Sequence, residues 1–288
     1  MFDKYGIQHP VNGMTWSEVY KLAEQFPNTG DDQQRQYGYV ANYYEHVFLN
    51  QILRIGITEG RTYINPHTLQ LSIDTQEWRD IGEVVLSALD KGAVNTEPEE
   101  GIAVSGLPPI VTGQTAMELG SFGTAFQFKQ LEEAYSLEPV DWGVVTVPVD
   151  PAAPTHTDSY EVDQIIGIHK ASEHKEEAWA FIKFITTSKD YYEASGEELR
   201  KFGIPVKTEL VPILDGKDLS PFYTLNGKRQ INNPYDKVDG TIIQAFKEAA
   251  EPILDKVLRG ELTLEGAFSR MQEEGQTAVN LAKEKLEE

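Results

Sequence analysis

Aromatic side chains are the residues of this sequence best suited to chemistry: it holds 4 Trp, 13 Tyr and 12 Phe among 288 residues. A sugar presents apolar C–H faces ringed by hydroxyl groups. A protein that binds sugars therefore needs aromatic faces for stacking and planar polar side chains at their edges. The sequence contains no G-x-S-x-G elbow, no P-loop and no G-x-G-x-x-G, so its motifs favour binding over bond cleavage.

Neither the histidines nor the carboxylates form a pattern that predicts catalysis or a metal site. The six histidines show no H-E-x-x-H and no zinc-ligand spacing; they are His9, His46, His67, His156, His169 and His174. With 46 acidic residues, a carboxylate pair like that of a glycosidase would arise by chance almost anywhere. We therefore expect no metal and no cofactor, and a glycan-active enzyme stays the alternative to a binding protein.

Length and composition bound the class of protein. A chain of 288 residues has room for two domains, and no apolar run approaches the roughly 18 residues of a membrane span. The net charge of −21 argues against nucleic-acid binding, because phosphate contacts need a basic surface. The absence of cysteine excludes disulfides and thiolate chemistry. Residues 1–4 do not begin a charged-then-apolar signal peptide, so we expect no such peptide in this chain.

The stretch from Ile165 to Ile185 organises the predicted fold. Residues 165–168 are apolar with a β-branched bias, as in a buried strand, and Ser172 stands where a helix N-cap is expected. Apolar residues then repeat at i, i+3, i+4 and i+7, which predicts a helix with one apolar face; they are Ala178, Phe181, Ile182 and Ile185. A strand that leads into a capped amphipathic helix indicates an α/β unit.

Other elements follow from the same kinds of signal. Thr15 and Glu18 form a capping-box pair that predicts a helix start, and Asp74 opens a second helix in the same style. Two helices are expected to close the chain, one over roughly 240–258 and one after Thr263 as N-cap. Two further segments, Gly113–Phe122 and Trp142–Pro148, resemble strand-containing segments of a known family, and this resemblance implies a strand in each.

Two blocks of the sequence carry a resemblance to a known family. The first runs from Phe2-Asp3-Lys4 to Gly13-Met14-Thr15-Trp16, and the second comprises Ala171-Ser172, His174–Trp179 and Phe181–Phe184. Both resemble the bacterial extracellular solute-binding proteins of family 1, the maltose-binding-like receptors of ABC sugar importers. The resemblance covers nearly all of this sequence but only the later part of the family, after the βαβ-rich opening of the first lobe.

The resemblance implies an α/β fold, periplasmic-binding-protein-like of type II, mostly second lobe plus the return segment of the first lobe. Residues 1–160 would form the second, C-terminal lobe, residues 161–212 the return segment of the first, and residues 213–288 the closing helices of the second. The chain would then be a fragment of a longer protein or the product of a truncated gene. The apolar face predicted over residues 178–185 would be left uncovered.

The resemblance also implies six ligand-binding candidates: Phe122, Tyr43, Tyr44, Glu45, Tyr160 and Asp163. Phe122 falls where the family places a stacking aromatic after a glycine, with core packing as its alternative role. Residues 43–45 fall where the maltose receptor has an acid and aromatic residues from its second lobe. Tyr160 and Asp163 lie near the predicted crossing between lobes, where they either face the cleft or form the hinge.

The function that the resemblance implies is that of the substrate-binding subunit of an ABC importer. Such a subunit closes two lobes over a sugar or oligosaccharide outside the cell and delivers it to the permease. Its partners would be a carbohydrate ligand, the permease membrane subunits, and the missing first-lobe segment or a second copy; no nucleic acid is expected. In its full-length form the protein would be periplasmic or a membrane-anchored lipoprotein. A glycan-active enzyme fragment and a truncated, non-binding remnant stay open as alternatives.

Overall fold

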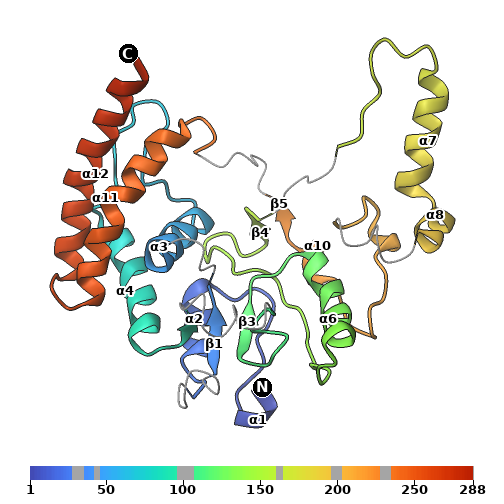
Figure 1. Ribbon diagram of the computed structural model, residues 1–288, viewed down its shortest axis with the longest axis horizontal. Helices are drawn as coiled ribbons and strands as arrows, with labels where there is room; N and C mark the ends of the chain where they lie inside the picture. The colour runs from blue at the N-terminus through green and yellow to red at the C-terminus, as the bar shows by residue number, and fades with distance from the viewer. Residues whose placement is uncertain are drawn as a thin grey trace.

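The computed structural model of this chain describes residues 1–27, 36–41, 46–95, 107–159, 165–195, 203–227 and 235–287 (Figure 1). Its helices are α1 (Phe2–Tyr5), α2 (Trp16–Ala23), α3 (Val47–Thr58), α4 (Gln76–Asp90), α6 (Phe122–Tyr135), α7 (Lys175–Thr187), α8 (Lys189–Ala194), the 3-10 turn η1 (Thr208–Leu210), α10 (Pro221–Thr224), α11 (Gly240–Leu258) and α12 (Leu264–Glu287). Its strands are β1 (Tyr37–Val40), β2 (Val94–Asn95), β3 (Thr115–Glu118), β4 (His156–Thr157) and β5 (Asn226–Gly227).

Three short parallel strands form the main sheet, in the order β2–β1–β3. Tyr39 on the central strand stands opposite Val94 on one side and Met117 on the other. Helix α2 approaches β1 so closely that a Cβ on Gly38 would lie 2.2 Å from the carbonyl oxygen of Ala23, which only glycine permits. Because the strands are parallel, their carboxyl ends share one edge, where ligands bind in open α/β sheets.

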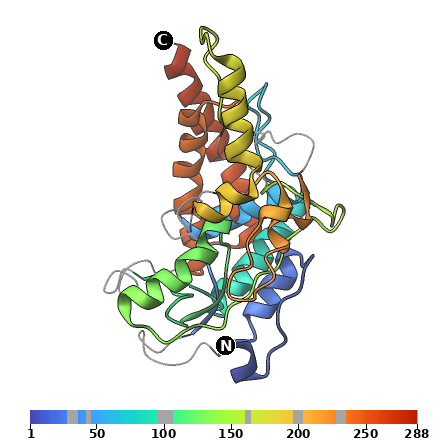
Figure 2. The same ribbon diagram turned by 90° about the vertical axis from the view of Figure 1, so that its right-hand side faces the viewer.

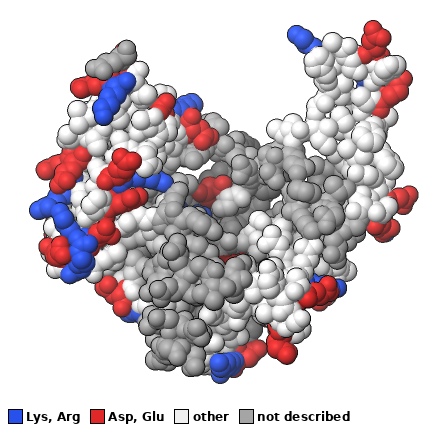
Figure 3. All heavy atoms as spheres, in the orientation of Figure 1, with Lys and Arg blue, Asp and Glu red and all other residues white. Residues whose placement is uncertain are grey.

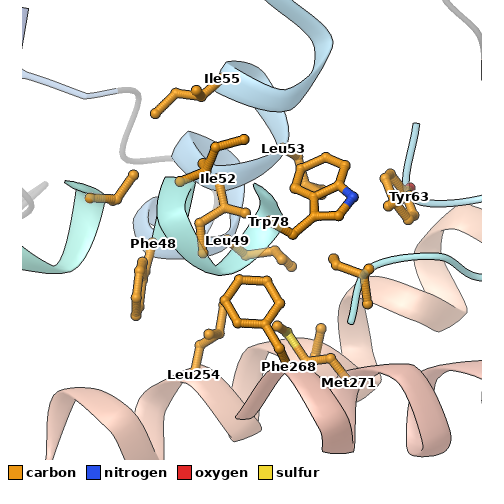
Figure 4. Close-up of a cluster of buried hydrophobic side chains, with 14 of the residues drawn as sticks. Phe48, Leu49, Ile52, Leu53, Ile55, Tyr63, Trp78, Leu254, Phe268 and Met271 are labelled. Carbon is orange, nitrogen blue, oxygen red and sulfur yellow. The ribbon is translucent and has the colours of Figure 1, made fainter. Parts of the chain in front are cut away.

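Helices α3, α4, α11 and α12 enclose the main apolar core (Figure 4). Phe268 and Met271 of α12 are fully buried there, together with Leu254 of α11 and Ile52 of α3. Helices α11 and α12 run side by side (Figure 1). Each large apolar side chain buried in this way stabilises the fold by about 1.5–3 kcal/mol relative to leaving it in water. This half of the molecule therefore supplies its own core.

Helix α12 also binds the extended chain that leads into α4 through two side-chain amides. Gln272 accepts from the backbone N–H of Ile73 at 3.0 Å and donates to the carbonyl of Leu71 at 2.9 Å. One turn later, Gln276 accepts from the N–H of Leu71 at 2.8 Å and donates to the carbonyl of Leu69 at 3.1 Å. Backbone groups that would otherwise need a neighbouring strand thus have partners on a helix.

A second, smaller apolar cluster surrounds α6. Phe122 and Phe126 of this helix are buried against Leu219. Partly buried neighbours complete the cluster; they are Trp142, Val144, Ile204, Val211, Leu214 and Phe222. Ile204 and Val211 belong to the predicted return segment of the first lobe, so the cluster joins residues from both sides of the predicted lobe boundary.

Helices α7 and α8 contribute to neither core. They contain no buried residue. Figure 1 shows α7 standing apart from the sheet and from α12, on the side that faces the viewer in Figure 2. Phe184 packs on Tyr191 of α8 with ring centroids 5.6 Å apart, while Trp179 and Phe181 are 58% and 62% exposed. The apolar face predicted over residues 178–185 is therefore uncovered by the described part of the chain.

Several local predictions are confirmed. Thr15 and Glu18 form a complete capping box at the start of α2. The closing helices begin at Gly240 and Leu264, with the Thr263 hydroxyl accepting the N–H of Gly266 at 3.2 Å. The second predicted helix start is shifted by one residue. Thr75 holds the N-cap position of α4, while the Asp74 carboxylate pairs with Arg79 and accepts from Ser269.

Two predicted strands are wrong. Residues 165–168 pair with no described strand, and Ile165 is 84% exposed. An apolar β-branched run becomes a strand only where another strand accepts its hydrogen bonds. Residues 142–148 are also outside any ladder, and Val144 packs on the α6 cluster instead. Ser172 is not the N-cap of α7, because its hydroxyl accepts the N–H of His174, which precedes the helix.

Candidate ligand-binding cavity

A cavity of about 340 Å³ opens at the edge of the sheet where the parallel strands end. Leu119, the residue after β3, lines it together with side chains of α3, α11 and the chain around Pro148 and Ser159. Figure 3 shows a wider hollow between the α11–α12 side and α7, and the residues that line the cavity lie outside α7. The volume lies at the lower end of the roughly 300–1,000 Å³ typical of small-ligand sites. A neighbouring notch beside Trp16 and Glu77 is half as large, about 170 Å³.

Helix α3 forms most of one wall because its two faces differ. Phe48, Leu49 and Ile52 are buried in the main core. Asn50 and Arg54 lie one turn apart on another face, and both line the cavity. The wall is thus fixed in position by the same helix whose opposite face is anchored in the core.

His46 determines where α3 begins and ties it to α11. Its Nδ1 accepts the backbone N–H of Leu49 at 3.2 Å, which makes His46 the N-cap of the helix. Since Nδ1 is an acceptor, Nε2 carries the ring proton and donates to Oδ1 of Asp255 at 3.1 Å. This contact connects the two helices that line the cavity.

Buried aromatic residues support the cavity. The rings of Tyr63 and Tyr235 lie 4.7 Å apart, and the Tyr235 hydroxyl accepts the backbone N–H of Tyr63 at 3.3 Å. Burial raises the pKa of Tyr235 to about 12, so this phenol is neutral at physiological pH. The indole N–H of Trp16 donates to the Thr58 hydroxyl at 3.2 Å. The Tyr235 hydroxyl and the Trp16 indole N–H at the cavity are thus already hydrogen-bonded within the protein.

Charged groups at the cavity come mainly from the helices. Arg54 on α3 and Lys247 on α11 line it, and Asp158 is the one acid among the described lining residues. Arg54 is exposed and makes no ion pair or hydrogen bond with another described residue. Glu118, at the end of β3, lies near the same edge, and burial raises the pKa of its carboxyl to about 7.

The six predicted ligand-binding residues divide into one that the structure describes and five that lie outside the described residues. Phe122 is 5% exposed, and it packs on Phe126 and Phe222 with ring centroids 5.2 and 5.6 Å away. This places Phe122 in the α6 cluster, while its contact with a ligand stays a prediction. The residues outside the described part are Tyr43, Tyr44, Glu45, Tyr160 and Asp163.

Sequence reasoning missed the two cations of the cavity. Arg54 had a detectable signal, since it is the one charged residue in the twelve-residue helix VFLNQILRIGIT. A lone cation in an otherwise largely apolar helix needs a polar environment on one side. Lys247 had no such signal, because a lysine in α11 reads as an ordinary surface residue.

The described residues hold no group of three or more histidine or acidic side chains arranged to bind a metal ion. Within the same ranges, no helix combines the length and apolarity that spanning a bilayer requires.

Comparison with known proteins identifies the family. The family model described as bacterial extracellular solute-binding protein matches residues 1–192. The chain belongs to this family. No curated protein matches the sequence. As a member of the family, the chain is a solute-binding protein, and the family is defined by binding rather than by a catalysed reaction.

Solved structures of the family show the same fold. The sugar-binding protein MalE of Xanthomonas citri has a TM-score of 0.58 at 15% identity, covering 100% of this chain and 68% of that protein. A sugar transporter protein of Rhizobium etli in an open conformation has a TM-score of 0.55 at 16% identity, covering 96% and 67%. A periplasmic oligogalacturonide-binding protein of Yersinia enterocolitica has a TM-score of 0.54 at 16% identity, covering 98% and 69%. This solute-binding protein thus has the α/β fold of type II periplasmic binding proteins and spans about two thirds of their length.

Proposed function

We propose that this solute-binding protein is the substrate-binding subunit of an ABC importer. It binds a sugar or oligosaccharide outside the cell, between two lobes, and delivers it to the membrane subunits of the permease. In its full-length form it is periplasmic or a membrane-anchored lipoprotein. It catalyses no reaction and needs no cofactor, because binding and release are its whole task.

The observation that supports this proposal best is the position and composition of the cavity. It lies at the carboxyl edge of a parallel sheet, where open α/β folds bind ligands. Its lining combines apolar side chains such as Leu53 and Ile57 with hydrogen-bonding groups such as Asn50 and Ser159. Sugars carry both apolar faces and hydroxyl groups, so a lining of mixed polarity suits them.

A panel of mono- and oligosaccharides screened by thermal shift tests the proposal. A ligand that binds only the native state raises the free energy of unfolding by about 2.7 kcal/mol at a hundredfold excess over its Kd. We expect at least one sugar to raise the melting temperature without being consumed. Release of reducing ends would instead indicate a glycan-active enzyme. A panel without any binding or turnover would indicate a non-binding remnant.

We propose that the ligand also contacts Phe122 and the predicted residues Tyr43, Tyr44, Glu45, Tyr160 and Asp163. Phe122→Ala should weaken sugar binding by ~1–3 kcal/mol, the scale of one lost aromatic contact. Phe222→Ala is the matched control, since Phe222 packs edge to face on Phe122 within the same cluster. A ligand role predicts weaker binding for the first variant alone. Equal affinity with a lower melting temperature for both variants would leave Phe122 with a packing role.

We propose, further, that residues 1–160 and 213–288 belong to the second lobe and residues 161–212 to the first. In this arrangement a first-lobe segment, or a second copy of the chain, covers the apolar face of α7. The exposure of Trp179 and Phe181 supports this, because large apolar side chains left in water favour association. Light scattering at several concentrations should show self-association of this chain, and Phe181→Ser should reduce it. A monomer at all concentrations would count against the second copy.

A further inference from the structure

The net charge of the described cavity lining is opposite in sign to the net charge of the whole chain. The sequence has 25 basic and 46 acidic residues. The described lining residues of the cavity nevertheless include two cations, Arg54 and Lys247, and one acid, Asp158. Two positive charges and one negative charge leave the lining with a net charge of +1. The described lining is thus positive in a chain whose net charge is −21.

The arginine of the cavity differs from three other described arginines, each of which pairs with a carboxylate; Arg270 of α12, like Arg54, has no such pair among the described residues. Arg61 pairs with Glu59 at 3.2 Å, Arg259 pairs with Glu261 at 2.8 Å, and Arg79 pairs with Asp74. Arg54 forms no such pair with a described residue, although it is exposed at the cavity. An incoming anion therefore need not displace an ion pair with a described carboxylate to reach its guanidinium group.

Glu118 is the acidic residue of the described three-stranded sheet, and it does not belong to the cavity lining. Arg54 and Glu118 both act on the buried hydroxyl of Tyr39, with opposite electrostatic effects on its pKa. The pKa of Glu118 is raised by burial alone. Burial thus favours the neutral form of this carboxyl and weakens the negative charge that it would bring to this edge of the sheet.

We infer that the cavity binds an acidic sugar, whose anionic group pairs with Arg54 while Lys247 supplies a second positive charge. This inference rests on the proposed function and narrows its ligand class. The planar guanidinium matches the two oxygens of a carboxylate or a phosphate through parallel hydrogen bonds, which an ammonium group does not. A uronic acid and a sugar phosphate both present such a group on a ring that carries apolar C–H faces.

The test compares each acidic sugar with a neutral form of the same skeleton. NMR titrations of the full 288-residue chain would use digalacturonic acid and its methyl ester, and glucose 6-phosphate and glucose. We expect one of the acids to bind about tenfold more tightly than its neutral counterpart, the scale of one charge-assisted pair at a solvent-accessible site. The pair that shows the difference distinguishes a carboxylate from a phosphate ligand. Added salt should reduce the difference, since it screens exposed charges.

Two variants with the same change in net charge separate a local from a global effect. Arg54→Gln should abolish the preference, so that the acid and its neutral counterpart bind this variant with similar affinity. Arg259→Gln, at an exposed position outside the cavity lining, should leave the preference intact. Equal losses in both variants, or neutral sugars that bind as tightly as acids, would overturn the inference while leaving the proposed function standing. Binding of no sugar of either kind would contradict both.

Discussion

Helices α12 and α7 carry the same kind of apolar face, but the face of α12 is buried and that of α7 is exposed. Phe268 of α12 is 0% exposed, whereas Phe181 of α7 is 62% exposed. Both residues lie on helices with apolar residues at helical spacing. The comparison shows that periodicity determines which face of a helix will be buried but not which segment will cover it.

The difference between the two helices comes from their neighbours. Helix α12 follows α11 after a short turn, and the pair packs on α4 and α3 to close one core. The main packing neighbour of helix α7 among the described elements is α8, and α8 contributes no buried residue. A covered α7 would gain roughly 1.5–3 kcal/mol for each large apolar side chain removed from water. Because burial of these side chains would contribute that free energy, we expect a partner to cover this face of α7.

The largest expected effect on the free energy of unfolding comes from a matched pair of Phe→Ala substitutions, one in each helix. Phe268→Ala removes a fully buried ring and should lower the free energy of unfolding by about 3–5 kcal/mol. Phe181→Ala removes an exposed ring and should change it by less than about 0.5 kcal/mol. Urea unfolding at low protein concentration measures both values.

The same pair of substitutions can contradict the difference between the two helices. If Phe181→Ala proves as costly as Phe268→Ala, the face of α7 is covered in solution. Repeating the unfolding at several protein concentrations then identifies the cover. A cost that rises with concentration points to a second copy of the chain, and a constant cost points to a contact within one chain.

The elements that sequence reasoning predicted well are those whose determinants are local. The capping box of Thr15 and Glu18 and the closing helices depend on residues within a few positions of each other. The strand predicted over residues 165–168 depends on a distant partner, and no local signal reports whether one is present. The cavity combines α3 with α11, about two hundred residues apart, so single-sequence patterns reveal its lining only where one residue is unusual, as Arg54 is in α3.

A second prediction concerns the polar contacts of the well-packed half. Gln272→Ala removes the side-chain partners of Ile73 and Leu71 and leaves backbone groups of a partly buried segment unpaired. The free energy of unfolding should fall by about 2–3 kcal/mol, because unpaired buried groups cost more than the hydrogen bonds themselves contribute. Thermal or urea unfolding measures the loss.

Gln244→Ala is the matched control for this prediction. Gln244 lies on α11, and its amide contacts the exposed side chain of Glu248 at 3.0 Å. Removing that contact should change the stability by less than about 0.5 kcal/mol. Equal effects of the two substitutions would mean that apolar packing alone holds residues 69–74 on α12.

The smallest expected effect compares a largely buried acidic residue, Glu118 of β3, with an exposed one, Glu176 of α7. Burial raises the pKa of Glu118 from 4.5 to about 7, so between these values the folded state binds more protons than the unfolded state. The stability contributed by this group is therefore fully present below about pH 4.5 and declines as the pH rises to about 7.

Glu118→Gln lacks the titration and stays neutral. It should match the wild type at about pH 4.5 and exceed its free energy of unfolding by about 1–2 kcal/mol at about pH 8, below the full value of the shift because the side chain is partly exposed. Glu176→Gln, on the exposed first turn of α7, makes the same change in charge and should show no such gain at the higher pH. A stabilisation of Glu118→Gln that is equal at both pH values would mean that packing of the amide, and not the cost of a buried charge, distinguishes this position from α7.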